Sequence, residues 1–176
     1  MGMNDVAAAI QRVRNVLSRR PDMGEHEDSC ATARWEQGVR VVSTHPNGAR
    51  LTTDMATEVG GTGDQVTPGW LFRAGLASCT ATTIALAAAA EGIELTALEV
   101  KVTSRTDSRG FLGMSDDRGD PVFAGPAHVW MHVKIAATNA SPERLRALVE
   151  SGDRCSPVAN AVRKVTPLTV HLEVDA

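Results

Sequence analysis

Aromatic residues and cysteines are few in this chain of 176 residues, and neither sign of charge predominates. Tyrosine is absent, and three Phe and three Trp cannot build a base-stacking surface. With a net charge of −3 and no strongly basic patch, the sequence predicts no nucleic-acid partner. The three cysteines form no C-x-x-C pair, which excludes the zinc-site and thioredoxin-like patterns.

The N-terminus also lacks the apolar core of a secretory signal. We therefore expect the protein to stay in the reducing cytoplasm, where cysteines are more often reactive or simply buried than bridged. The length of the chain fits one domain with an extension and is ample for a hydrophobic core.

The centre of the chain is one long apolar stretch, for which we predict a helix from Pro68 to Glu91, roughly 36 Å long. Thr67 suits the N-cap, Pro suits the first helical position, and Gly92 can end the helix in the left-handed conformation. Apart from its last residue, its only charge is Arg73, so the helix should be buried or cross a membrane. Because it is mostly Ala with hydroxyl residues in its middle, we expect a buried helix and no membrane association.

Residues 1–33 are predicted to form a separate N-terminal region. Pro21 ends an amphipathic helix whose apolar residues recur at helical spacing: Val6, Ile10, Val13 and Leu17. An acidic linker containing Cys30 follows. We expect this helix to pack on its own domain or on a second copy of the chain.

Residues 34–176 are predicted to form an α+β domain of mostly antiparallel sheet around the long helix. A strand over 34–44 and a return strand over 49–56 should be joined at Asn47-Gly48, which is a strong hairpin signal. Alternating patterns predict further strands over 95–106, 127–137 and 165–174, with a solvated loop over 107–125 and helices over 141–152 and 158–163. Because the long apolar helix leaves much surface to cover, we expect a homodimer.

Two of the cysteines lie in different settings. Cys79 is in the middle of the long helix among small residues, whereas Cys155 precedes a Ser-Pro helix start, where the helix dipole favours a thiolate. Each could equally be an inert buried side chain, and the residue types alone favour that interpretation.

The segments around both cysteines resemble the active-site motifs of the OsmC/Ohr family of thiol-dependent peroxidases. The first motif is Pro68-x-x-Leu71-Phe72-x-Ala74-Gly75-Leu76-Ala77-Ser78-Cys79, and the second is Cys155-Ser156-Pro157-Val158-Ala159-Asn160-Ala161-Val162. The likeness extends from about residue 34 to the C-terminus. It implies an OsmC-like fold, an intertwined homodimer with active sites at the subunit interface, and no metal, flavin or haem.

The resemblance also implies reduction of organic hydroperoxides in oxidative-stress defence. The Cys79 thiolate would attack the peroxide and become a sulfenic acid, which Cys155 would convert to a disulfide. A dithiol reductant, such as a lipoylated protein, would restore the thiols. A mid-helix thiolate needs a cation, and we predict Arg50 for this role. The family orients such an Arg with a Glu just after the helix-start Pro, where this chain has Gly69.

Two other functions remain open. The missing Glu favours a non-catalytic redox-sensing or small-ligand-binding protein that keeps the scaffold and both thiols. In a purely structural dimer, both cysteines would be core residues. Formation of a disulfide with peroxide would distinguish the enzyme and the sensor from the structural dimer. Turnover with a dithiol would then distinguish the enzyme from the sensor.

Overall fold

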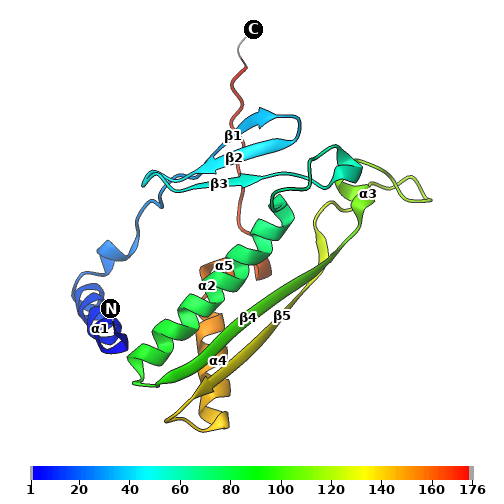
Figure 1. The fold of residues 1–176 in the computed structure, drawn as a ribbon. Helices are drawn as coiled ribbons and strands as arrows, with labels where there is room; N and C mark the ends of the chain where they lie inside the picture. The colour runs from blue at the N-terminus through cyan, green and yellow to red at the C-terminus, as the bar shows by residue number, and fades with distance from the viewer. Residues whose placement is uncertain (1, 175–176) are drawn as a thin grey trace.

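The structure, a computed structural model, describes residues 2–174 and has an α+β fold (Figure 1). In chain order its main elements are α1 (Met3–Arg19), β1 (Thr32–Gln37), β2 (Arg40–Thr44), β3 (Arg50–Thr53), α2 (Pro68–Ala90), β4 (Leu95–Thr106), α3 (Ser108–Phe111), β5 (Pro126–Ala137), α4 (Pro142–Arg154) and α5 (Pro157–Arg163). Short 3-10 turns, η1 (Pro21–Gly24) and η2 (Thr57–Val59), interrupt two of the connections. The strands form two antiparallel sheets, β1–β2–β3 and β4–β5.

The long helix α2 runs through the centre of the molecule, as predicted (Figure 1). The Thr67 hydroxyl accepts a hydrogen bond from the Trp70 N–H, and Pro68 is the first helical residue. Just beyond the helix, Gly92 has φ +66°, a left-handed conformation that suits glycine. Local capping residues therefore define both ends of α2.

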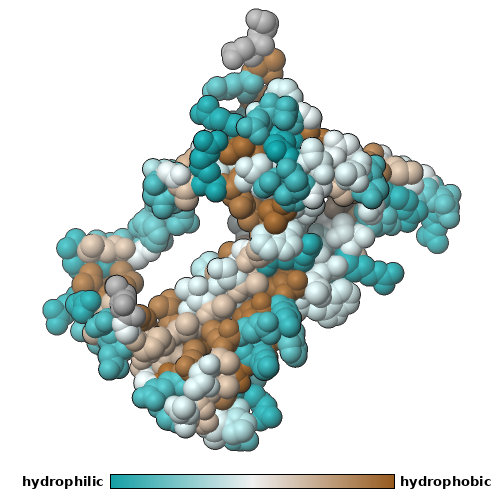
Figure 2. All heavy atoms as spheres, viewed as in Figure 1, coloured by the Kyte–Doolittle hydropathy of each residue, from teal (hydrophilic) through white to brown (hydrophobic). Residues whose placement is uncertain are grey.

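One face of α2 packs against β4, α4, α5 and α1. Its buried residue Ile84 forms a core cluster with Ala88, Ile93 of the following loop and Leu148 of α4. The other face stays open: Phe72 is 37% exposed, and Figure 2 shows hydrophobic residues along the visible side of the helix. By length and composition α2 could also cross a membrane, a property that core helices share. The burial predicted on all sides is thus reached on one side only within a single chain.

The prediction of one strand over 34–44 is wrong, because the chain reverses within it. Gly38, with φ +54°, forms a tight turn between β1 and β2, and Gln37 pairs with Arg40. The Trp35 indole N–H donates to the carbonyl of Gly38 at 2.9 Å and braces the turn. A glycine flanked by strand-forming residues hid this reversal, because the apolar pattern continues on both sides of it.

The second hairpin is confirmed: the His45 N–H bonds the Ala49 carbonyl, and Gly48 has φ +91°. Its return strand, β3, ends at Thr53 rather than Ala56. The reason is Asp54, whose N–H donates to the Val66 carbonyl and whose carboxylate accepts the Met55 N–H, so the backbone leaves the β2 ladder.

The predicted strands over 95–106 and 127–137 are confirmed as β4 and β5, which pair along their length. Their inward residues, such as Leu98 and Val133, pack against the core cluster. The connection over 107–125 is a loop that contains the one-turn helix α3 and an isolated bridge between Ser115 and Pro121.

The predicted strand over 165–174 does not form in the described chain. This segment is extended and leads away from the body of the molecule after α5 (Figure 1). Its apolar side chains are between 77% and 99% exposed: Val165, Leu168, Val170, Leu172 and Val174. Alternating apolar and polar residues favour an extended backbone, but a strand also needs hydrogen bonds to a neighbouring backbone. In the described chain, no neighbouring strand pairs with this segment.

The predicted N-terminal helix is confirmed as α1, and it packs on α2. Val6 and Ile10 are partly covered in this contact, while Val13 is 57% exposed. The linker that follows η1 is exposed and includes Cys30.

Candidate thiol site

Cys79 is partly buried in the middle of α2, and its sulfur contacts one hydroxyl from the far end of the chain. The Ser156 Oγ lies 3.3 Å from the Cys79 Sγ, although the two residues are 77 positions apart. Ser156 is fully buried and is the N-cap of α5, where its Oγ accepts the Ala159 N–H at 3.4 Å. It also accepts a hydrogen bond from the Thr80 hydroxyl at 3.2 Å.

These contacts fix the direction of the hydrogen bond to sulfur. A serine hydroxyl has one proton and two acceptor sites. Because Ala159 and Thr80 occupy both acceptor sites of Ser156, its proton points at the Cys79 sulfur. A donor aimed at sulfur stabilises negative charge there, and the buried hydroxyl chain strengthens that donor. The mid-helix thiol is therefore supported by the cap of another helix, which sequence reasoning did not foresee.

Close packing of α4 on α2 sets this geometry. At Gly152 of α4, an added Cβ would lie 2.7 Å from the Ile84 Cα and 2.6 Å from its Cγ1. Only glycine allows this approach without a shift of one helix. Since Ser156 follows α4 after one intervening residue, the tight contact at Gly152 holds Ser156 over Cys79.

Cys155 is that intervening residue. Its N–H bonds the carbonyls of Ser151 and Gly152 at the end of α4, and its side chain is exposed. All three cysteines are free thiols in the structure. The fold thus brings the residue after Cys155 into contact with Cys79, while the pairing of the two sulfurs stays a prediction.

Arg50, the predicted cation, is the exposed first residue of β3 and pairs with Thr44. It lines a shallow pocket together with Trp35 and Val42. The sheet that carries it lies beyond the N-terminal end of α2 (Figure 1), and its side chain makes no hydrogen bond within residues 2–174. Within one chain the structure does not bring Arg50 to Cys79, and its role stays a prediction.

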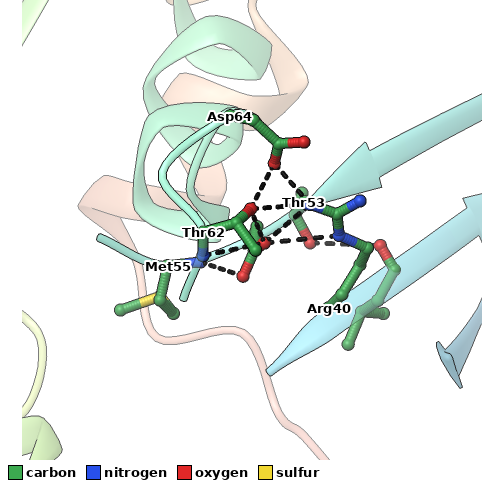
Figure 3. Close-up of polar contacts among 7 residues, drawn as sticks. Arg40, Thr53, Met55, Thr62 and Asp64 are labelled. Carbon is green, nitrogen blue, oxygen red and sulfur yellow. Dashed lines mark hydrogen bonds and ion pairs between the residues drawn. The ribbon is translucent and has the colours of Figure 1, made fainter. Parts of the chain in front are cut away.

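A different arginine of the same hairpin is held by carboxylates, as Figure 3 shows. Arg40 of β2 donates to Asp54 at 3.0 Å, to the Thr62 hydroxyl at 2.7 Å and to Asp64. Asp54 is buried and also accepts the Thr62 hydroxyl and the Met55 N–H, both at 2.7 Å.

The hydrogen bonds of this cluster shift the pKa values of Asp54 and Arg40 in opposite directions. The hydrogen bond from the Thr62 hydroxyl, followed by that from the Met55 N–H, holds the pKa of the Asp54 carboxyl well below its usual range. The carboxylates of Asp54 and Asp64 in turn raise the pKa of Arg40. Sequence reasoning missed Arg40, because its partners lie 14 to 24 residues further along the chain and no local pattern connects them.

The loop that supplies these partners is tightly folded. Gly61 donates its N–H to the Ala56 carbonyl, and a Cβ at Gly61 would lie 1.9 Å from the Met55 carbonyl oxygen. A glycine is therefore required for the loop to bring Thr62 and Asp64 over Arg40. Across residues 2–174, no group of three or more His, Cys, Asp or Glu side chains is arranged to hold a metal ion.

The antiparallel sheets, the long central helix and the thiol on it define the class of protein. A profile of the family described as "OsmC-like protein" matches residues 61–171, a span that includes Cys79 and Cys155. The chain belongs to the OsmC-like protein family. Both α1 and the Arg40 strand lie outside the matched span.

Solved structures of this family share the fold. An OsmC-like protein from Mycoplasma pneumoniae has a TM-score of 0.66 at 18% identity, over 80% of this chain and 91% of its own. An organic hydroperoxide resistance protein OsmC from Legionella pneumophila has a TM-score of 0.53 at 21% identity, over 79% and 91%. The organic hydroperoxide resistance protein OhrB of Bacillus subtilis has a TM-score of 0.51 at 20% identity, over 79% and 93%. A comparison with curated protein sequences gave no match.

Proposed function

We propose that this protein is a thiol-dependent peroxidase that reduces organic hydroperoxides in oxidative-stress defence. The observation that carries the proposal is the Ser156 hydroxyl, which donates to the Cys79 sulfur at 3.3 Å in a partly buried setting. Such a donor can hydrogen-bond the sulfur when it reacts as a nucleophile and negative charge is present on it. The names of the relatives from Legionella pneumophila and Bacillus subtilis, both organic hydroperoxide resistance proteins, support the same substrate class.

In the proposed reaction, the Cys79 thiolate attacks the distal oxygen of the hydroperoxide. The O–O bond breaks, the sulfur keeps the hydroxyl as a sulfenic acid, and the leaving alkoxide takes a proton to become an alcohol. The Cys155 thiolate then attacks the Cys79 sulfur, so that a disulfide forms and the hydroxyl leaves as water after protonation. A dithiol reductant supplies two electrons through two exchange steps and releases both thiols in the cytoplasm.

The proposal includes a homodimer. Two observations support it: the open apolar face of α2 and the exposed apolar side chains of residues 165–174. A second chain could also deliver a cation to Cys79, since the β1–β3 sheet does not reach this sulfur within its own chain. Arg50 is one candidate for that cation, and Arg40, already oriented by two carboxylates, is the other.

Thiol counting and peptide mapping after cumene hydroperoxide test the proposal, with Cys79→Ser and Cys155→Ser variants alongside the wild type. We expect the wild type to lose two thiols, to form a Cys79–Cys155 disulfide and to turn over with dihydrolipoamide. We expect Cys155→Ser to stop at the sulfenic acid. If both thiols stay reduced in excess peroxide, the peroxidase proposal fails.

A redox sensor is the second candidate, and Gly69 is the residue that favours it. An added Cβ at Gly69 would lie 3.8 Å from a guanidinium nitrogen of Arg73, which instead donates to the Ser104 hydroxyl. The carboxylate that the family places after the helix-start proline is therefore missing at this end of α2. A disulfide that forms with peroxide but is not turned over by a dithiol would support the sensor.

A further inference from the structure

Cys155 lines a second pocket, between helices α1, α2 and α4. Its volume is about 290 Å³, and three helices form its wall. Its lining includes Ile10 and Arg14 of α1, Leu86 and Ala87 of α2, Ser151 of α4, and Cys155.

This pocket joins an apolar wall to one positive charge. Ile10, Leu86 and Ala87 supply the apolar wall, and Arg14 supplies the charge. Arg14 makes no ion pair within residues 2–174, and no carboxylate lines the pocket. Asp153, the acidic residue nearest in sequence to Cys155, points its carboxylate at Arg163 at 2.7 Å. Among the lining residues that the structure describes, Arg14 is therefore the one charged side chain, and it gives the pocket a positive charge.

The N-terminal helix completes the pocket. Ile10 and Arg14 are one helical turn apart, so both side chains point from the same face of α1 toward α2 and α4. Helix α1 lies outside the span that matches the family, so this pocket is a feature of this chain's own N-terminal region. Both Arg14 and Cys155 are exposed, and a small molecule can therefore reach them.

We propose that this pocket binds a small organic thiol that carries a carboxylate on an apolar body, and that this compound reduces the protein at Cys155. The carboxylate would pair with Arg14 and the apolar body would lie against Ile10 and Leu86. This step rests on the proposed function, because it requires the Cys79–Cys155 disulfide.

The reduction balances as a thiol–disulfide exchange. The thiolate of the bound compound attacks the Cys155 sulfur, the S–S bond breaks, and Cys79 leaves as a thiolate that the Ser156 hydroxyl stabilises. A second thiol of the same compound, or of a second molecule, then attacks the mixed disulfide and releases the Cys155 thiolate. The reductant loses two electrons and ends as a disulfide.

The pocket can be tested without any peroxide chemistry. Iodoacetate and iodoacetamide differ mainly by a negative charge, so the ratio of their alkylation rates at Cys155 measures the local potential. We expect Arg14→Gln to lower that ratio about threefold, the order of effect that one nearby unit charge has in a watery setting. Arg14→Lys should keep the ratio close to that of the wild type.

Arg12→Gln is the matched control, because it removes the same charge from α1 at a position that does not line the pocket. Circular dichroism and thermal unfolding of each variant verify that α1 is intact. Equal ratios for the two glutamine variants, or an unchanged ratio in Arg14→Gln, would overturn the proposal.

Reduction of the preformed disulfide tests the second half of the inference. Arg14→Gln should slow reduction by dihydrolipoate about threefold and leave reduction by the neutral dihydrolipoamide unchanged. If no disulfide forms with peroxide, the proposed function fails, while the alkylation ratio still decides whether the pocket selects anions. If the enzyme turns over but the two reductants respond equally to Arg14→Gln, only the pocket inference fails.

Discussion

The hydroxyl of Ser156 donates to the sulfur of Cys79 at 3.3 Å and joins two segments that lie 77 residues apart. Each partner is next to another chemically useful side chain, since Thr80 follows Cys79 and Cys155 precedes Ser156. The Thr80–Ser156 contact is fully buried and brings the two cysteine-containing segments together into one site.

Removal of this hydroxyl should slow the chemistry of Cys79. In Ser156→Ala the sulfur loses its donor, and a hydrogen bond to a charged group contributes about 1.5–3 kcal/mol, so we expect at least a tenfold fall in rate. The measurement is the single-turnover rate with cumene hydroperoxide, together with the pH dependence of alkylation at Cys79. Thr82→Ala, which removes an exposed hydroxyl of α2, is the control and should react like the wild type. Equal rates for both variants would contradict this role of Ser156.

The Arg40 cluster predicts an acid-sensitive contribution to stability. Because the pKa of Asp54 is lower in the folded than in the unfolded protein, its contribution is fully present above about pH 4 and is lost as pH falls toward the folded-state value. Asp54→Asn should therefore be less stable than the wild type at pH 7, and the difference should narrow as the pH falls. Urea unfolding of both proteins between pH 7 and 2 measures this.

Asp117→Asn serves as the control for that experiment, since Asp117 is exposed in the loop before β5. Its stability should follow the wild type at every pH. A difference between wild type and Asp54→Asn that stays constant with pH would show that the carboxylate charge of Asp54 is not responsible.

Because Gly152 of α4 lies against Ile84 of α2, a substitution at Gly152 should lower both the stability of the fold and the reactivity of Cys79. Gly152→Ala would place a methyl group 2.6 Å from the Ile84 Cγ1, and overpacking of this kind costs about 1–3 kcal/mol. We expect lower stability in chemical unfolding and slower peroxide reaction, because the shift of α4 moves Ser156 away from Cys79. Gly75→Ala has open space around its new Cβ and should not lower stability. Equal unfolding midpoints for the two variants would contradict the steric argument.

The C-terminal segment predicts a measurable effect on assembly. Carboxylates at Leu168 and Leu172 would be harmless in a lone chain, where both side chains are more than 80% exposed. If these residues are covered by a second copy, as we propose, Leu168→Asp with Leu172→Asp should convert dimers to monomers. Light scattering after gel filtration measures the mass. Thr169→Asp, on the alternate side of the segment, is the control and should leave the mass unchanged.

The parts of the fold that local chemistry controls were predictable from the sequence. The ends of α2 follow from Thr67, Pro68 and Gly92, and the second hairpin follows from Asn47-Gly48, because each residue favours its own backbone conformation. The turn at Gly38 was missed, since strand-forming residues flank a single glycine. The missing strand over 165–174 reflects the absence of a neighbouring backbone in the single chain rather than a lack of strand propensity.

The same distinction between local sequence and tertiary packing applies to the residues of the candidate site. Cys79 and Cys155 could be selected from the sequence because a family motif surrounds each of them. The role of Ser156 could not, because its contact with Cys79 depends on how closely α4 packs on α2, and that distance is set by the space at Gly152. Arg40 was missed for a related reason: its carboxylate partners come from a loop that only Gly61 allows to fold back.

The exposed apolar side chains of residues 165–174 should make the stability of the folded protein depend on its concentration in the cell. A folded chain with such a segment in water gains free energy only when a neighbour covers it, so its melting temperature should rise with protein concentration. At low concentration the lone chain would leave these apolar side chains exposed to water, and exposed apolar surface promotes aggregation. The amount of folded protein in a cell would then depend on its rate of synthesis. Faster synthesis would raise the concentration of chains, and a higher concentration would favour the association that stabilises them.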